Sequence, residues 1–348
     1  MLAAELRSVA VPHATGLPPN FSITWNEILE AVDPFLKAVG KRLVTQAEQF
    51  EPAVSAYAQY ALGGHGKQLR PLLVSLSGSA SGKVTDNHVT VAAIIEMVHL
   101  ATLVHDDIID EAAMRRGRPT LAANWGNEIS VLLGDCLFAN ALKLAASFPT
   151  PEICRAVASA TNTVCSGEIL QTQCRREFHL SREEYFKILA MKTGELFALS
   201  CDLGAHLSQA NPAHREALRH YGLSLGTAYQ LYDDCLDVFG SEAAAGKTLG
   251  NDLANGEVTL PLLIAMERMT RAERAEVENQ IKNWVPENFA RIMVSLQKRD
   301  VLTESRRIIR QYLAAARQTL LMLPASEGRD GLAGLLDYLS QQSDALGV

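Results

Sequence analysis

The chain has 348 residues, of which 48% are hydrophobic and 20% charged, a balance that predicts a packed core and excludes a disordered chain. The formal net charge of −7 lacks the basic excess typical of nucleic-acid-binding proteins, so we expect no nucleic-acid partner. No uncharged apolar run reaches the roughly 18 residues that a membrane-spanning helix needs, so we expect no stable membrane anchor.

Residues 1–22 come first, and they have neither a basic start nor a long apolar stretch. We expect a flexible N-terminal arm there rather than a signal peptide. Residues 23–348 show helical periodicity almost throughout, without a fixed repeat, an alternating strand pattern or a linker rich in Pro, Gly or Ser. One all-α domain is therefore expected for 23–348. Helical stripes are predicted over 24–62, 89–106, 128–147, 152–176, 182–208, 213–239 and 303–322.

The six cysteines are scattered through apolar segments and form no CxxC pair. Isolated cysteines of this kind are mostly small core residues, and they suit a reducing compartment. We therefore expect a cytoplasmic protein without disulfides.

Two segments carry the same acidic pattern, Asp-Asp-x-x-Asp, in apolar surroundings: LVHDDIIDEA (103–112) and QLYDDCLDVF (230–239). Residues four apart share one face of a helix. Unpaired buried carboxylates cost several kcal/mol each, so these groups either face water or hold a cation. The apolar flanks favour a central cavity lined from two sides, where oxygen ligands suit Mg²⁺ bridging to a phosphate. The carboxylates are Asp106, Asp107, Asp110, Asp233, Asp234 and Asp237.

Four basic clusters lie elsewhere in the chain: GGHGKQLRP (63–71), MRRGRPT (114–120), MKTGELF (191–197) and GKTLGNDL (246–253). Each alone reads as a solvated charge group. Glycines let a backbone approach an anion, and Arg forks match phosphate oxygens in pairs. Together with the acidic triplets, they suggest two anionic ligands, one held through Mg²⁺ and one held directly by Lys and Arg.

The ordered motifs resemble those of the trans-isoprenyl diphosphate synthases of the polyprenyl synthetase family. The resemblance implies an all-α fold around a deep central cavity, usually as a homodimer. It also implies that an allylic diphosphate condenses head-to-tail with isopentenyl diphosphate, with three Mg²⁺ ions bound alongside the substrate. The motifs are GKQLRP, EMVHLATLVHDDIIDEAAMRRGRPT, GDCLFANA, GEILQ, KTGELF, YQLYDDCLDVFG and GKTLGNDLANGEVTLPLL.

The resemblance assigns a role to each matching residue. The main metal ligands would be Asp106, Asp110 and Asp233, supported by Asp107, Asp234 and Asp237. The allylic diphosphate would be held by Arg115, Lys192, Thr193, Gln230 and Lys247. Isopentenyl diphosphate would be held by Lys67, Arg70, His99 and Arg116. Glu168 and Gln171 would line the substrate cavity, with helix packing as the alternative.

The helix before the first triplet is expected to form the wall along which the product grows. Thr102 and Ala101 lie about one turn before Asp106, and Val98 lies two turns before it, each turn being about 5.4 Å. Family members that stop early often carry an aromatic residue at the position of Ala101. We therefore expect a product longer than twenty carbons, in a range of roughly six to ten isoprene units, since the wall sets the depth of the pocket. Such a product makes transient membrane contact plausible.

Three residues depart from the common family pattern: His65, Gln68 and Glu257. Glu257 matters most, because a carboxylate facing a diphosphate would repel it. Two rival functions are a class I terpene cyclase and a non-catalytic partner subunit. A cyclase would need a different second metal motif and no site for isopentenyl diphosphate, whereas partner subunits typically lose the acidic motifs.

Overall fold

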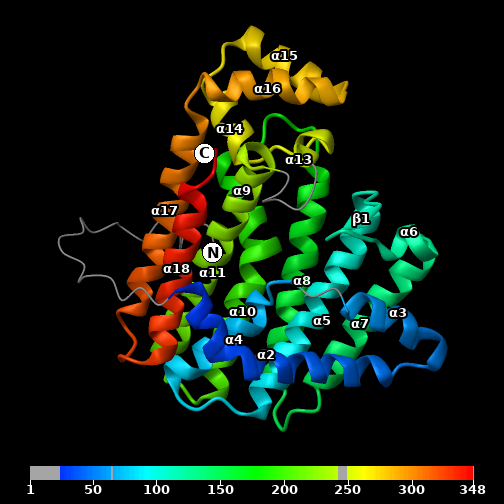
Figure 1. The fold of residues 1–348 in the computed structure, drawn as a ribbon, viewed down its shortest axis with the longest axis vertical. Coiled ribbons are helices and arrows are strands. Elements are labelled where there is room, and N and C mark those ends of the chain that lie inside the picture. The colour runs from blue at the N-terminus through cyan, green and yellow to red at the C-terminus, as the bar shows by residue number, and fades with distance from the viewer. Residues whose placement is uncertain (1–23, 64–65, 242–248, 348) are drawn as a thin grey trace.

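The computed structural model describes residues 24–63, 66–241 and 249–347. This part of the chain is almost entirely helical, with one two-stranded hairpin, which confirms the all-α class (Figure 1). The first half contains α2 (Trp25–Glu48), α3 (Pro52–Leu62), α4 (Leu69–Ser81), α5 (Asp86–Ile109), β1 (Met114–Arg115), β2 (Arg118–Pro119), α6 (Leu121–Trp125), α7 (Asn127–Ala145) and α8 (Glu152–Gln173). The second half contains α9 (Arg182–Leu189), η1 (Ala190–Gly194), α10 (Glu195–Leu207), α11 (Pro212–Phe239), α13 (Asn251–Ala254), α14 (Leu260–Glu267), α15 (Arg271–Lys282), α16 (Pro286–Gln297), α17 (Val301–Leu320) and α18 (Glu327–Asp344).

Local sequence signals set where the helices begin and end. The side chain of Thr24 caps α2 and forms a capping box with Glu27, which satisfies backbone N–H groups that the first turn leaves free. The prediction of one helical stripe over 24–62 is wrong in detail, because α2 ends at Glu48 and α3 begins at Pro52. Proline fits the first turn of a helix and cannot continue an earlier one, so Pro52 separates the two.

Helix α5 lies in the interior and packs against α7, α4, α2 and α10 (Figure 1). It is the one helix among the described residues that is long and apolar enough to cross a membrane, but most of that window is buried inside the fold. A helix that is apolar on all sides is expected at the centre of a large helical protein. The acidic triplet at its end is therefore presented from the core.

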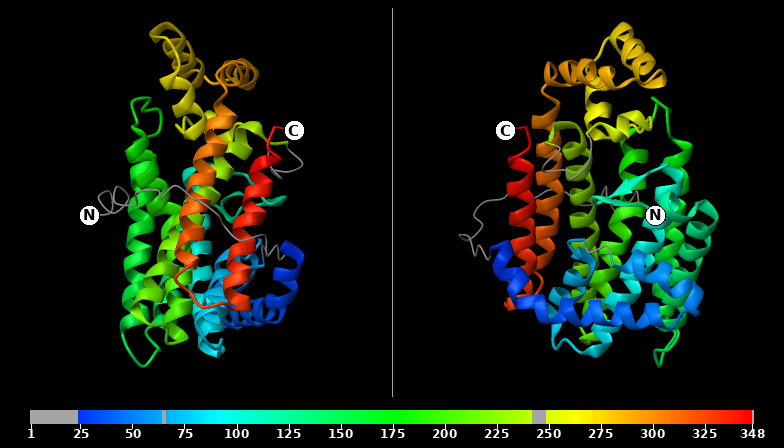
Figure 2. Two further views of the ribbon diagram at one scale, coloured as in Figure 1. Left: turned by 90° about the vertical axis from the view of Figure 1, so that its left-hand side faces the viewer. Right: turned by 45° about the vertical axis from the view of Figure 1, so that its right-hand side comes forward.

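A second layer is formed by α10, α11, α17 and α18, of which α11, α17 and α18 run side by side along the long axis (Figure 2). Helix α2 crosses one end of the molecule, and α15 with α16 caps the other. The buried apolar residues form two clusters, and α4 and α10 contribute to both. The division into an arm over 1–22 and one domain over 23–348 stays a prediction, and residues 1–23 lie outside the described residues.

Candidate active site

The first acidic triplet lies at the C-terminal end of α5. Asp106 and Asp107 belong to its last turn, and Asp110 is its C-cap. The C-terminus of a helix carries partial negative charge, so three carboxylates there need nearby cations. Two are present: Arg115 Nε lies 2.7 Å from Asp107 Oδ1, and Arg175 Nη2 donates to Asp110 Oδ1. Two of the three carboxylates at the end of α5 thus already have an arginine partner.

Arg115 and Arg116 are placed by a hairpin that the sequence analysis did not predict. Strands β1 and β2 pair Met114 with Pro119 and Arg115 with Arg118. The two residues between the strands, Arg116 and Gly117, both have positive φ, at +51° and +72°. Such a turn matches the twist of paired strands and makes a tight two-residue loop possible. The loop directs Arg115 to Asp107, and Arg116 lies against Gly66.

Asp106 is the member of the first triplet whose charge is least compensated. Burial raises the pKa of Asp106 to about 7; Lys192 opposes this rise, whereas Glu168 and Asp110 add to it. Lys192 Nζ lies 2.6 Å from Glu168 Oε2. Burial alone would lower the pKa of Lys192, but Asp106 and Glu168 raise it above its ordinary value, so the ammonium stays charged.

A π-helical turn, η1, presents Lys192 and Thr193 to the site. The sequence predicted one continuous helix over 182–208, whereas the structure has a π turn at Ala190–Gly194. Single π turns inside helices are frequent at functional sites. Gly167 of α8 lies against the turn: a Cβ there would approach the backbone nitrogen of Lys192 to 2.9 Å. The close approach of α8 to η1 therefore depends on the missing side chain, and it brings Glu168 to Lys192.

The second triplet lies in the last turns of α11 and is more deeply buried than the first. Asp234 is only 4% exposed and accepts hydrogen bonds from Tyr185 Oη and Gln230 Nε2. Burial raises its pKa to about 7, against the effect of these hydrogen bonds. The backbone N–H of Asp252 donates to Asp237 at 3.1 Å, while Asp233 is half-buried. Asp233 is therefore the most accessible carboxylate of this triplet.

Thr193 joins η1 to the second triplet. Its hydroxyl donates to Gln230 Oε1 at 2.9 Å, and Gln230 in turn donates to Asp234. The two predicted diphosphate contacts thus lie together, and the Thr193 donor is already used by Gln230. Tyr185 was missed by the sequence analysis, because a tyrosine on a helical stripe carries no signal that distinguishes it from core packing.

Glu257 connects the two triplets electrostatically. It contributes to the raised pKa of Asp234, and its own pKa, raised first by burial, is raised further by Asp110. The carboxylate has two partners: Arg175 Nη2 lies 3.1 Å from Oε1, and Gln171 Nε2 donates to Oε2 at 2.5 Å. Glu257 is therefore not a bare charge at the site, although it shares Arg175 with Asp110.

A second group of basic residues surrounds His99 and includes Arg116 of the hairpin loop. Burial lowers the pKa of Arg70, with Glu96 opposing and Arg116 adding to the effect. Burial and then the positive charges of Arg70 and Arg116 hold the pKa of His99 well below its usual value. His99 is thus neutral, and it would contact an anion through a ring N–H rather than through charge. Glu96, one helical turn before His99, was not singled out from the sequence.

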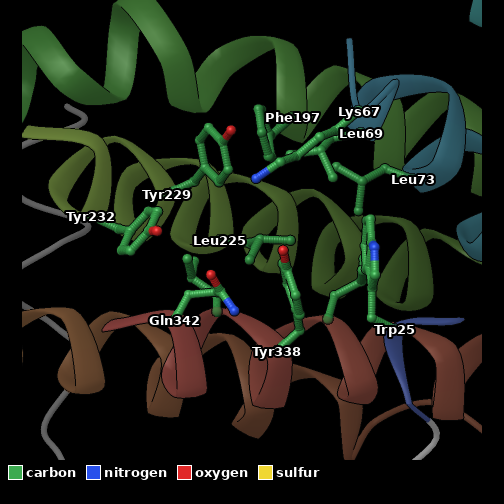
Figure 3. Close-up of a pocket in the computed structure, with 12 residues that line it drawn as sticks. Trp25, Lys67, Leu69, Leu73, Phe197, Leu225, Tyr229, Tyr232, Tyr338 and Gln342 are labelled. Carbon is green, nitrogen blue, oxygen red and sulfur yellow. The ribbon is translucent and has the colours of Figure 1, made fainter. Parts of the chain in front are cut away.

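Lys67 lies at the edge of a mostly apolar pocket between α2, α4, α11 and α18 (Figure 3). Its ammonium points toward Tyr229, and Trp25 and Tyr338 stack with ring centroids 4.6 Å apart on the opposite side. Gly66, the residue before Lys67, lies against the side chain of Arg116. The predicted isopentenyl diphosphate residues thus come from three segments that lie close together.

The predicted chain-length residues differ in exposure. Ala101 and Val98 are 0% and 1% exposed, whereas Thr102 is half-buried. The Thr102 hydroxyl donates to the carbonyl of His99 at 2.7 Å. Their role in product length stays a prediction. Lys247 lies outside the described residues.

The carboxylates fit a magnesium ion that is shared with a ligand. Among the described residues, no three His, Cys, Asp or Glu side chains converge into a complete metal site. Mg²⁺ commonly takes one or two carboxylates and completes its shell with waters and substrate phosphates. Burial raises the pKa of Asp106 to about 7, so a cation bound there would favour the charged carboxylate.

Comparison with known proteins finds similar sequences and a similar fold. The model of the polyprenyl synthetase family matches residues 51–293. The octaprenyl diphosphate synthase of Haemophilus influenzae is 33% identical over 316 residues, which cover 90% of this chain and 96% of that protein. The nonaprenyl diphosphate synthase of Mycobacterium tuberculosis is 34% identical over 311 residues, which cover 88% of this chain and 92% of that protein. A similar structure is that of a polyprenyl synthase from Caulobacter crescentus, complexed with calcium and isoprenyl diphosphate. It is 33% identical with a TM-score of 0.86, and the match covers 92% of this chain and 99% of that one.

Proposed function

The chain belongs to the polyprenyl synthetase family, and on that premise we propose that it condenses an allylic diphosphate with isopentenyl diphosphate head-to-tail. The observation that carries the proposal is that the two acidic triplets share a set of polar partners. Arg175 contacts Asp110 of the first triplet and also Glu257. Thr193, next to Lys192, is joined through Gln230 to Asp234 of the second triplet. Lys192 and Arg115 lie close enough to Asp106 to lower its pKa, and Arg70 and Arg116 lie close enough to His99 to lower its pKa. Two anionic ligands therefore have two differently built sites.

The reaction divides into steps that these residues can support. The carbon–oxygen bond of the allylic diphosphate breaks, and diphosphate leaves with the bonding electrons. The double bond of isopentenyl diphosphate attacks the allylic cation, a carbon–carbon bond forms, and a proton is lost to the released diphosphate. Mg²⁺, when bound, supplies Lewis-acid stabilisation of the departing diphosphate.

The protein side chains would hold, orient and shield the reactants. Asp106, Asp110 and Asp233 would hold Mg²⁺, with three ions expected when substrate is present. Arg115 and Lys192 would contact the allylic diphosphate, and Arg70 and Arg116 would hold isopentenyl diphosphate without ionising it. The apolar interior around the triplets would exclude the water that otherwise traps the cation.

We propose a product longer than twenty carbons, in the range of roughly six to ten isoprene units, because the residues of α5 one and two turns before Asp106, Ala101 and Val98, lack the aromatic ring that would shorten the pocket. The octaprenyl and nonaprenyl relatives support this range. A homodimer, transient membrane contact and a cytoplasmic location remain predictions.

A product assay tests the function. The purified protein receives Mg²⁺, isopentenyl diphosphate and, separately, five-, ten-, fifteen- or twenty-carbon allylic diphosphates, and the dephosphorylated products are sized by mass spectrometry. Products beyond twenty carbons are expected. A folded protein that consumes no isopentenyl diphosphate would favour a partner subunit, and cyclic hydrocarbon formed without it would favour a cyclase.

A further inference from the structure

Arg175 bridges two acidic residues that are far apart in the sequence. It follows the end of α8, and its side chain is only 18% exposed. Nη2 donates to Asp110 Oδ1 and lies 3.1 Å from Glu257 Oε1, while Nη1 donates to the carbonyl of Ile109 at 3.3 Å. One guanidinium thus joins the end of α5 to the segment before α14.

The bridge is held in place by the backbone on both sides. The N–H of Arg176 donates to the carbonyl of Gly256 at 2.7 Å, and the N–H of Glu257 donates to the carbonyl of Asp252 at 2.8 Å. Gln171, one turn before Arg175, donates to the second oxygen of Glu257. Glu257 therefore has little freedom to leave Arg175, and it keeps the guanidinium close to Asp110.

Asp110 is one of the carboxylates that the proposed function assigns to the metal. In the structure, one of its oxygens is occupied by a guanidinium. A divalent cation at Asp110 would lie within a few ångströms of that positive charge, and like charges in a partly buried site repel strongly. An incoming metal therefore competes with Arg175 for the negative charge of Asp110.

A diphosphate removes this obstacle. The Nε of Arg175 is buried and has no hydrogen-bond partner among the described residues, so the guanidinium has a donor to spare. Arg forks bind phosphate oxygens in pairs. Once released from Asp110, the group can turn to a neighbouring diphosphate while Glu257 keeps it at the site.

We propose that Arg175, held by Glu257, is a positioning residue that makes metal binding at Asp110 depend on the diphosphate. This inference rests on the proposed function, since it takes Asp110 as a metal ligand. The positive charge beside Asp110 comes from Arg175, and the contact with Glu257 orients its guanidinium. The alternative is that the pair only staples α8 to the segment before α14, in which case it affects stability alone.

The test measures binding rather than turnover. Mn²⁺ replaces Mg²⁺ as the probe, and its affinity for the full chain is measured by electron paramagnetic resonance with and without inorganic pyrophosphate. The wild-type protein should bind Mn²⁺ weakly alone and more tightly with pyrophosphate. In Arg175→Gln, Mn²⁺ alone should bind more tightly, and the enhancement by pyrophosphate should shrink about five-fold or more, the lower end of common coupling factors.

Arg310→Gln is the matched control, because it removes an arginine from the exposed pair of Arg310 and Asp344, 2.6 Å apart, and should leave the enhancement unchanged. The double variant Arg175→Gln/Glu257→Lys moves the cation to the neighbouring position and should recover most of the enhancement.

If Arg175→Gln does not fold, Arg175→Lys decides. It keeps the charge, but a single ammonium lacks the fork that spans both carboxylates, so its enhancement should fall below that of the wild-type protein. The folded variant could instead show the same enhancement as the wild-type protein and only a lower unfolding midpoint. That result would show that the pair of Arg175 and Glu257 serves stability alone. A wild-type protein that binds neither Mn²⁺ nor pyrophosphate would instead overturn the proposed function.

Discussion

At the scale of single residues, the burial of Asp234 determines how tightly its carboxylate holds a proton. Tyr185 and Gln230 each donate a hydrogen bond to it, which favours the charged form. Burial outweighs these bonds and raises the pKa of Asp234 to about 7. The folded, metal-free protein therefore binds a proton at Asp234 that the unfolded chain releases near its ordinary pKa of 3.8.

This difference predicts a pH dependence of stability. Because the folded state holds the proton more tightly, the contribution of Asp234 to stability is largest at low pH and is lost as the pH rises from about 4 to about 7. The melting temperature of the protein in EDTA should therefore fall between pH 5 and pH 8. The fall should be smaller in Asp234→Asn, which has no carboxyl group to titrate; equal slopes in calorimetry would contradict the assignment.

Residue size on α5 is predicted to control product length. Ala101→Phe should shorten the products, because an aromatic ring about one turn before Asp106 would block the space into which the product chain grows. Ala101 is fully enclosed, so the ring must displace neighbours, whereas Thr102→Phe starts from a half-buried position and is the gentler variant.

Mass spectrometry of the dephosphorylated products would measure the change in length. Thr102→Ser, which keeps the hydroxyl that bonds to His99, serves as the control. Unchanged product length in both phenylalanine variants would remove these residues from the wall.

At the scale of elements, the contact between α8 and η1 aligns the groups around Asp106. Gly167 allows this contact, since a Cβ would lie 2.9 Å from the backbone nitrogen of Lys192 and from the Cβ of Met191. Backbone cannot move aside as a flexible side chain can. The distance of 2.6 Å between Lys192 and Glu168 therefore depends on how closely the two elements approach.

Gly167→Ala should separate α8 from η1. We expect a loss of about 1–3 kcal/mol in the free energy of unfolding, typical of an overpacked core, and a clear fall in kcat/KM as Lys192 moves. Gly40→Ala is the control, because nothing lies within 4 Å of the added Cβ, and it should stabilise α2 by about 0.5–1 kcal/mol. Urea denaturation and steady-state kinetics measure both effects; a Gly167→Ala enzyme with unchanged kcat/KM would contradict the argument.

At the scale of the whole molecule, α7 covers α5 on one side and leaves apolar residues on the other. Val131 and Leu132 are 43% and 61% exposed. Neighbouring exposed apolar residues are typical of interaction surfaces. We therefore expect the predicted homodimer to form through the exposed side of α7.

Leu132→Glu should convert the dimer to a monomer, because a buried unpaired carboxylate at an interface is costly. Size-exclusion chromatography with light scattering would measure the mass. Leu321→Glu is a matched control, since Leu321 at the end of α17 is 62% exposed and lies on another element. A wild-type protein that runs as a monomer, or a variant that remains dimeric, would exclude α7 as the interface.

The sequence by itself determined the all-α class, the family and several of the long helices, such as α5, α7, α8, α11 and α17, because these depend on local periodicity and on motifs within single segments. The positions of α4 and of α14, α15, α16 and α18 were not predicted. It did not predict the hairpin at 114–119, since two-residue strands are too short to show alternation, nor the π turn at Lys192, which interrupts a continuous apolar stripe. Tertiary structure alone decided which cation meets which carboxylate. Arg175 contacts Glu257 from 82 residues away, and such long-range pairs depend on packing between helices rather than on any local pattern.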